Sequence, residues 1–356
     1  MKIAIQPDRT GDESYSDQWA LALKKHGVDV KWVNIYKREI LSQLRDCDGF
    51  MWRFIHLPDH KKVARRILRI VEDEMEIPVF PDQDTCWHYD DKIAQYYLFK
   101  AHGIPSPKTW IFWNKNDAIG WANKHARYPV VWKLACGASS SNVALIRSKE
   151  EAHRVIKRMF STGWSGGRNS SLLWTGMPSE SVLRRLIGIP WAIAREVKWQ
   201  MKEGKVHLYD PRWKSYWEHE HGYAYFQEFV QNNDFDTRIT VIGDRAFGYR
   251  RMNRPNDFRA SGSGNFVVAP GYIDKRCIEM AFRVSQLGKF QSMAYDFIYR
   301  NNQPVICEIS YTFVDWMVHS CPGHWDTNLN WIDGQMWPEH AQVEDFLAYL
   351  ESVKNK

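Results

Sequence analysis

Residues 129–143 read PVVWKLACGASSSNV, a stretch that decides how the rest of the sequence is interpreted. Lys133 lies inside an apolar run that is typical of a strand, where an ammonium group is costly to bury without an anion. The loop after it consists of small residues, among them Gly137, Ser139, Ser140 and Ser141, whose backbone N–H groups can surround phosphate oxygens. The stretch predicts a phosphate-binding strand and loop. A polar edge strand followed by an ordinary surface turn is the alternative.

The segment before this stretch predicts a helix that stops at a boundary. Residues 86–102 (CWHYDDKIAQYYLFKAH) have helical character and include Lys92. The following GIPSP, residues 103–107, combines glycine with two prolines and therefore indicates a domain boundary. Beyond the lysine loop, residues 161–225 have the least regular pattern, with a few strand-like pieces such as WAIAREVKW and KVHLYD.

Further along the chain, two acidic residues lie in apolar runs that predict a hairpin. The runs are MAYDFIY and PVICEIS, and they are joined through NNQP, a turn sequence. Asp296 falls in the first run, and Glu308 and Ser310 share one face of the second, because residues two apart on a strand point the same way. A bound Mg²⁺ would compensate the two carboxylates. An exposed edge hairpin with both carboxylates in water is the alternative.

Between these motifs lies a charged stretch that begins with QEFV at 227–230. The end of a strand there offers backbone groups to an adenine edge, and an aspartate shortly afterwards can accept hydrogen bonds from ribose hydroxyls. Arginines further on can hold phosphates in bidentate fashion. The residues concerned are Glu228, Asp236, Arg238, Arg250, Arg251 and Arg259. An ordinary charged strand face is the alternative.

The N-terminal region alternates short strands with helices. Strands are predicted at 1–6, 28–36, 49–55 and 77–82, and helices at 16–26, with Ser16 as a candidate N-cap, and at about 59–75. This β-α-β-β-α-β order predicts a small α/β domain with a largely parallel sheet. The turn after the first strand reads QPDRTGD and lacks GxGxxG, so a dinucleotide site is not expected there.

Composition narrows the function classes further. The 356 residues correspond to two or three compact units, and the net charge of +6 is not concentrated in a basic block, so no nucleic-acid partner is expected. No apolar run reaches the length of a membrane span, and the N-terminus turns polar too early for a signal peptide. Six cysteines without a CxxC predict a reduced, cytoplasmic protein. The oligomeric state stays open, a homodimer included.

The order of the motifs resembles the ATP-grasp superfamily. The chain carries DK before a helix, GIPSP, a strand lysine, a Gly/Ser loop, QEF, DxR, GDR, DFR, and then D, E and S. From about Asp90 to Ser310 it is most similar to RimK-like, glutathione-synthetase-like and D-alanine–D-alanine-ligase-like enzymes. The resemblance implies an α/β fold in three parts: a parallel-sheet domain at 1–105, an α+β lid with an insertion at 106–225, and an antiparallel-sheet subdomain with the metal site at 226–356.

The resemblance also implies roles for the nucleotide-binding residues. Lys92 and Lys133 correspond to the lysines that hold the ATP phosphates, and Gly137 to Ser141 to the loop that closes over them. Glu228 and Phe229 correspond to the adenine-contacting hinge, and Asp236 to the ribose acceptor.

The same resemblance implies a magnesium site and cationic catalytic groups. Asp296 and Glu308 correspond to Mg²⁺ ligands, and Ser310 stands where the family usually has asparagine. Arg259, with Arg250 or Arg251, corresponds to the groups that stabilise an acyl-phosphate and its tetrahedral successor. Which of Arg250 and Arg251 points inward depends on the strand register.

The function implied is an ATP-dependent carboxylate–amine ligase that uses ATP and Mg²⁺ to form an amide through an acyl-phosphate. The substrates would be a small-molecule carboxylate and an amine, and the 18 tryptophans extend the candidates to a sugar acid or a cell-surface polysaccharide precursor. Two alternatives stay open. One is an ATP-grasp kinase that phosphorylates a hydroxyl, and the other is an inactive nucleotide- or carbohydrate-binding scaffold.

Overall fold

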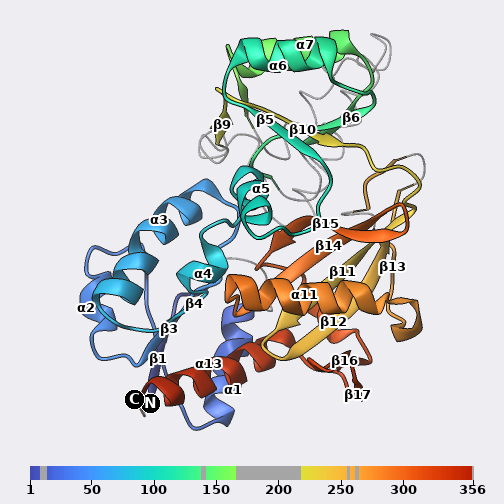
Figure 1. Ribbon diagram of the computed structural model, residues 1–356. Helices are drawn as coiled ribbons and strands as arrows, with labels where there is room; N and C mark the ends of the chain where they lie inside the picture. Colours follow the sequence, from blue (N-terminus) through green and yellow to red (C-terminus); the bar gives the residue numbers. More distant parts are fainter. Residues whose placement is uncertain (9–13, 138–141, 166–217, 255–256, 261–263, 355–356) are drawn as a thin grey trace, which may run out of the picture. The chain divides into compact units, whose positions relative to one another are not determined.

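The computed structural model describes residues 1–8, 14–137, 142–165, 218–254, 257–260 and 264–354. The chain divides into two compact units, and Figure 1 labels their elements. The first unit consists of 1–89, 94–107 and 230–356. The second unit consists of 90–93 and 108–229.

The first unit begins with the predicted parallel sheet. Its strand order is β2-β1-β3-β4, and all three pairings are parallel. The strands are shorter than predicted and the helices lie between them: β1 (Lys2–Ile5), α1 (Tyr15–Lys25), β2 (Asp29–Trp32), α2 (Ile40–Leu44), β3 (Gly49–Met51), α3 (Pro58–Arg69), a π-helical turn (Ile70–Glu74), β4 (Val79–Phe80) and α4 (Gln83–Cys86). The carboxyl ends of β1 and β3 therefore share one edge of this sheet.

The N-cap of α1 is Ser14, so the expectation that Ser16 caps this helix is wrong. Ser14 has extended backbone angles, and its side chain accepts a hydrogen bond from the amide of Asp17. Ser16 is already inside the helix, where its buried hydroxyl pairs with that of Ser14. The extended residue can turn its oxygen back onto the first free N–H groups, which a helical residue cannot.

A larger antiparallel sheet fills the C-terminal part of the first unit. Its strand order is β15-β14-β11-β12-β16-β17, with β13 paired to β12. The strands and helices are β11 (Phe235–Ile242), β12 (Arg245–Met252), β13 (Phe266–Val267), a 3₁₀ turn (Pro270–Tyr272), α11 (Lys275–Gly288), β14 (Ser292–Arg300), β15 (Gln303–Ser310), α12 (Asp315–His319), β16 (Gly323–Trp325), β17 (Trp331–Asp333) and α13 (Pro338–Lys354). The predicted hairpin is confirmed, since Asn301 and Asn302 both have positive φ in the turn between β14 and β15.

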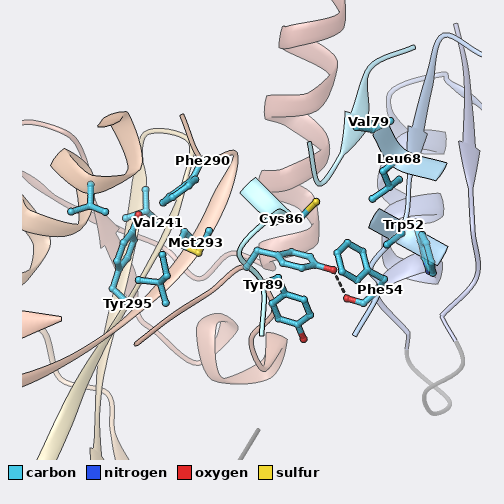
Figure 2. Close-up of a cluster of buried hydrophobic side chains, with 14 of the residues drawn as sticks. Trp52, Phe54, Leu68, Val79, Cys86, Tyr89, Val241, Phe290, Met293 and Tyr295 are labelled. Carbon is cyan, nitrogen blue, oxygen red and sulfur yellow. Dashed lines mark hydrogen bonds between the residues drawn. The ribbon is translucent and has the colours of Figure 1, made fainter. Parts of the chain in front are cut away.

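Both sheets of the first unit contribute to one hydrophobic cluster. Trp52 and Val79 from the parallel part lie in the same cluster as Val241, Met293 and Tyr295 from the antiparallel sheet (Figure 2). The hydroxyl of Tyr311 also donates a hydrogen bond to the carbonyl of Phe54. Burial of this shared apolar surface explains why the two ends of the chain form one compact unit. The three-part division of the sequence stays a prediction.

The second unit is built on a four-stranded antiparallel sheet of order β5-β10-β6-β7. Its elements are β5 (Thr109–Phe112), α6 (Lys115–Lys124), β6 (Val130–Lys133), β7 (Val143–Ile146), α7 (Lys149–Met159), β8 (Trp164–Ser165), β9 (His219–Glu220) and β10 (Ala224–Glu228). Helices α6 and α7 contribute Trp121, Val155 and Met159 to the same core as Trp132 and Phe226 of the sheet. Most of the predicted insertion, residues 166–217, lies outside the described residues.

The helix predicted at 86–102 is shorter than expected, because α5 (Lys92–Ala101) begins only at Lys92. Cys86 is the last residue of the separate short helix α4. Asp90 lies between them with a φ of 52°, a left-handed conformation that interrupts a helix. The break places Lys92 at the start of α5.

Candidate active site

A β-bulge in the β14–β15 hairpin brings the two predicted metal-binding carboxylates together. Phe297 pairs with Ile306, so a regular ladder would pair Asp296 with Cys307. The register shifts by one residue at this point, and Asp296 instead pairs with Glu308. Phe297 and Ile306 belong to the hydrophobic core on one face of the sheet, which leaves Asp296 and Glu308 on the other. Bulges of this kind re-aim side chains next to functional sites.

Two arginines on the neighbouring strands hold Asp296. Arg238 on β11 donates from Nε to Oδ1 at 2.6 Å and from Nη2 to Oδ2 at 2.8 Å. Arg251 on β12 lies 2.8 Å from Oδ2 of Asp296 and also donates to both oxygens of Asp236, at 2.7 and 2.6 Å. The four side chains are 7–14% exposed. They form an alternating chain of charges with no net charge.

This network sets the ionisation of Asp296. Burial alone raises the pKa of a carboxyl group, but Arg238 and Arg251 outweigh it here and hold the pKa of Asp296 below its usual range. Burial raises the pKa of Asp236, against the opposing effect of Arg251. Asp296 is therefore ionised at neutral pH. The sequence placed Arg238 in the charged stretch and in the DxR motif but did not predict its contact with Asp296, although its spacing of two residues from Asp236 on one strand was the signal that both share a face.

The strand register separates Arg250 from Arg251. Arg251 pairs with Asp236 and lies on the face of Asp296, whereas Arg250 points to the opposite face. There its guanidinium lies 4.2 Å from the ring centroid of Phe235 and 5.6 Å from that of Tyr272. A cation–π contact of this kind is a stabilising use of the charge.

The remaining residues of the predicted metal and catalytic set engage local partners. Arg259 forms a bidentate ion pair with Asp257, the shorter contact being 2.7 Å. Ser310 pairs with Ala294 across the hairpin, and its hydroxyl donates to the carbonyl of Thr312 at 2.8 Å. The roles predicted for Arg259 and Ser310 stay predictions.

In the second unit, Lys92 and Gly137 are brought together by the start of α5. The backbone N–H of Lys92 donates to the carbonyl of Ala135 at 2.9 Å, and its ammonium donates to the carbonyl of Gly137 at 3.1 Å. The amide of Gly137 in turn donates to Oδ1 of Asp90 at 2.7 Å. Gly137 has a φ of 124°, and a Cβ there would lie 2.2 Å from the side chain of Asn142, so only glycine fits.

Lys133 is the last residue of β6 and is 5% exposed, as is Lys92. The loop after it closes where the amide of Leu134 donates to the carbonyl of Asn142. Lys92 therefore contacts the glycine loop through its hydrogen bond to Gly137, and Lys133 immediately precedes this loop in the chain. Ser139, Ser140 and Ser141, predicted as part of this loop, lie outside the described residues.

The predicted adenine hinge follows β10. The amide of Glu228 donates to the carbonyl of Lys108 at 2.7 Å, and the amide of Lys108 donates to Oε2 of Glu228 at 3.1 Å. Phe229 is the last residue of the second unit. The hinge role of Glu228 and Phe229 and the ribose role of Asp236 stay predictions.

Comparisons with known proteins show what the chain is similar to. No protein-family model matches the chain. The alpha-aminoadipate–LysW ligase LysX of Saccharolobus solfataricus is 24% identical to this chain over 244 residues. The match covers 68% of this chain and 66% of LysX, so this chain spans just under two thirds of the length of that relative.

Solved structures align over nearly the whole chain. A RimK domain ATP-grasp protein from Sphaerobacter thermophilus has a TM-score of 0.53 at 12% identity, over 98% of this chain and all of that chain. D-alanine–D-alanine ligase from Bacillus anthracis complexed with ATP has a TM-score of 0.55 at 9% identity, over all of this chain and 99% of that one. The chain has the ATP-grasp fold. The predicted fold class and the resemblance to RimK-like proteins and D-alanine–D-alanine ligases are confirmed.

The residues of this ATP-grasp chain fit the two groups that the fold implies. Lys92 and Lys133 are buried ammonium groups, and a buried cation is stabilised by an anion such as a phosphate. Asp296 and Glu308 offer oxygen ligands on one face of the sheet, the donor set that Mg²⁺ prefers. Their separation within one hairpin is fixed by backbone hydrogen bonds and by the bulge.

Along the described ranges, none of the helices combines the length and the apolar character that crossing a bilayer requires. All six cysteines are free thiols, five of them buried.

Proposed function

We propose that this chain is an ATP-dependent carboxylate–amine ligase that forms an amide through an acyl-phosphate. The observation that carries the proposal is the bulged hairpin, which sets Asp296 opposite Glu308 beside the paired guanidinium groups of Arg238 and Arg251. The ATP-grasp fold and the names of the relatives, among them LysX and D-alanine–D-alanine ligase, support the same reaction class.

The proposed reaction has two steps. A carboxylate oxygen of the first substrate attacks the γ-phosphorus of ATP, the bond from that phosphorus to the bridging oxygen breaks, and ADP leaves. The amine nitrogen then attacks the acyl carbon and loses a proton. Phosphate departs with one oxygen of the original carboxylate. No nucleophile from the protein enters either step.

The chain's own residues would divide this work by charge. Lys92 and Lys133 hold the phosphates of ATP, and Gly137 gives the backbone room to approach them. Asp296 and Glu308 hold Mg²⁺, which when bound neutralises charge on the phosphates during transfer. Arg251 lies on the metal-binding face, which favours it over Arg250 as the group that stabilises the oxyanion of the tetrahedral state.

The identity of the carboxylate substrate is a finer part of the proposal. A sugar acid or a polysaccharide precursor belongs in any screen because the chain contains 18 tryptophans. Some of these, such as Trp87, Trp113 and Trp316, present large exposed rings, whereas Trp19, Trp52 and Trp132 are core residues. Small carboxylates and amines of other classes belong in the same screen.

The decisive experiment follows the oxygen of the carboxylate. Carboxylates are crossed with amines, and ADP release and product mass are recorded. With the active carboxylate labelled with ¹⁸O, one labelled oxygen is expected in the released phosphate. Hydroxylamine is expected to trap a hydroxamate when the amine is withheld. Unlabelled phosphate together with a stable phosphorylated alcohol would replace the ligase with a kinase, and no ATP turnover with any pair would leave a scaffold.

A further inference from the structure

Arg53 is an arginine of the first unit that forms no ion pair with a carboxylate of the described residues. It follows β3 by two residues and is half-buried. Its guanidinium carbon lies 4.1 Å from the ring centroid of Tyr15, and its Nη2 reaches the carbonyl of Phe313 only at 3.4 Å. Its Nε is buried and has no hydrogen-bond partner among the residues that the structure describes. A guanidinium carries five N–H donors, so most of the binding capacity of Arg53 is unused.

The acidic groups around Arg53 are committed elsewhere or do not reach it. Asp8 uses both carboxylate oxygens to accept from the amides of Tyr15 and Ser16, at 3.1 and 3.0 Å. Asp315 accepts from the amide of Trp316 at 2.8 Å. Glu339 and Arg53 interact electrostatically, yet neither oxygen of Glu339 has a hydrogen-bond partner within the described ranges. By contrast, Arg238 and Arg251 of the same unit are fully paired with aspartates.

The position of Arg53 in the fold is where ligands bind in parallel sheets. Arg53 lies beyond the carboxyl end of β3, and the loop after the neighbouring β1 carries Asp8. Ligands of open α/β sheets bind outside these carboxyl ends. The carbonyl that Arg53 and Tyr15 share belongs to Phe313, three residues after Ser310 at the end of the strand that carries Glu308.

We propose that Arg53 binds an oxyanion of the carboxylate substrate, a second carboxylate or a phosphate that does not itself react. The inference rests on the proposed function, because it takes the bound anion to be part of the substrate of the ligase. A bidentate guanidinium–oxyanion pair uses two parallel N–H bonds and satisfies the Nε donor that lacks a partner. The held group is a non-reacting one, because a carboxylate bound in this way has its lone pairs engaged and is a poorer nucleophile. The substrate is therefore at least doubly anionic.

The test compares three probes that differ only in the second anionic group. Glutarate carries a second carboxylate, 4-phosphonobutyrate carries a phosphonate, and butyrate carries neither. Each is titrated calorimetrically into the full chain, with and without Mg²⁺ and a non-hydrolysable ATP analogue. We expect at least one doubly anionic probe to bind ten-fold or more tightly than butyrate. Arg53→Gln should lower the affinity for that probe at least ten-fold and leave butyrate unchanged.

Two further variants keep the test falsifiable. Arg53→Lys preserves the charge without the planar fork and should give intermediate affinity. Arg38→Gln, at an arginine whose side chain is 94% exposed in the same unit, should change nothing. If only the binding of glutarate depends on Arg53, the group that Arg53 holds is a carboxylate. If only the binding of the phosphonate depends on Arg53, that group is a phosphate.

The outcome for Arg53 is separable from the outcome for the ligase. Equal binding of butyrate and both dianions by the wild-type protein overturns the proposal, as does unchanged dianion binding in Arg53→Gln. Binding that depends on Arg53 in a protein that never turns over ATP keeps the oxyanion site and refutes the ligase. If the protein turns over ATP but binds the dianions equally well without Arg53, the ligase is kept and the oxyanion site is refuted.

Discussion

Asp296 lies directly opposite Glu308 across β14 and β15, and the extra residue Cys307 is what puts it there. Two carboxylates in this cross-strand position repel each other unless cations lie close. Arg238 and Arg251 neutralise Asp296 from the other side, and Glu308 adds a second carboxylate on the same face of the hairpin. Two carboxylates on one face are the donor set that the proposed Mg²⁺ site requires.

Replacing Glu308 tests this arrangement. Glu308→Gln keeps the shape of the side chain but removes its charge, so ADP release should fall about 10²–10³-fold, the range for loss of one preorganised electrostatic group. The melting temperature without ligand should stay within a few degrees of the wild type. Chelation of Mg²⁺ in the wild type should likewise stop turnover.

The matched control for Glu308 is Glu279→Gln, an exposed glutamate on α11 in the same unit. It should leave both turnover and melting temperature unchanged. Full activity in Glu308→Gln, or stoichiometric zinc in the purified protein whose removal unfolds it, would contradict a magnesium site here.

The sequence predicted the order of strands and helices well because hydrophobic alternation and turn residues act locally. Asn301-Asn302 marked the hairpin because asparagine tolerates the left-handed conformation that such a turn requires. The break before α5 was missed because it depends on a single left-handed residue, Asp90, which no periodicity reveals. The union of the two ends of the chain into one unit depends on packing between distant residues such as Trp52 and Tyr295.

The arginine network predicts a large cost for removing one member. Arg238→Met leaves the buried Asp296 with only Arg251, and breaking a buried ion pair in this way costs about 3 kcal/mol or more of the free energy of unfolding. The lowered pKa of Asp296 means that the native state gains stability from its ionised form above the unfolded pKa of about 4. That gain is lost as the pH falls below this value.

Urea unfolding at pH 7 and at pH 3 measures this effect. The difference between the wild type and Arg238→Met should be largest at pH 7 and should shrink at pH 3. Arg283→Met, at an exposed position on α11, should cost little at either pH. A cost for Arg238→Met that is the same at both values would show that packing rather than charge is lost.

The lysine pair predicts a thermal signature of nucleotide binding. Mg-ATP binds only the native state and should raise the melting temperature of the wild type, with about 2.7 kcal/mol of stabilisation at a hundred-fold excess over Kd. Lys133→Ala should remove most of this shift, because one of the two buried ammonium groups is lost. Lys124→Ala, on the exposed end of α6, should keep the full shift. An unchanged shift in Lys133→Ala would place the nucleotide elsewhere.

The burial of one candidate site residue was predictable from the sequence, but the geometry around the candidate site was not. Lys133 was visible because a lysine in an apolar strand is unusual, and it is indeed buried. Which of Arg250 and Arg251 faces Asp296 could not be read from two adjacent arginines, since the answer depends on the pairing of Arg251 with Asp236. The effect of Cys307 was equally hidden, because a bulge changes the face of a residue without changing the sequence pattern.

Glu339 predicts an unusual dependence of stability on pH. It lies in the first turn of α13 and is fully buried, and its oxygens accept no hydrogen bond from another residue of the described ranges. Burial, with Asp315 and Asp8 adding to it and Arg53 opposing, raises the pKa of Glu339 to about 8. The unfolded chain ionises this group near pH 4, so the unfolded state binds fewer protons between these two values and the stability falls as the pH rises.

Glu339→Gln cannot ionise and should escape this loss, gaining on the wild type by up to about 1.4 kcal/mol per pH unit between pH 5 and pH 8. Urea unfolding of both proteins at pH 5 and pH 8 measures the gain, and exposed Glu279→Gln serves as the control. A difference between Glu339→Gln and the wild type that does not grow with pH would mean that Glu339 is ionised in the native state.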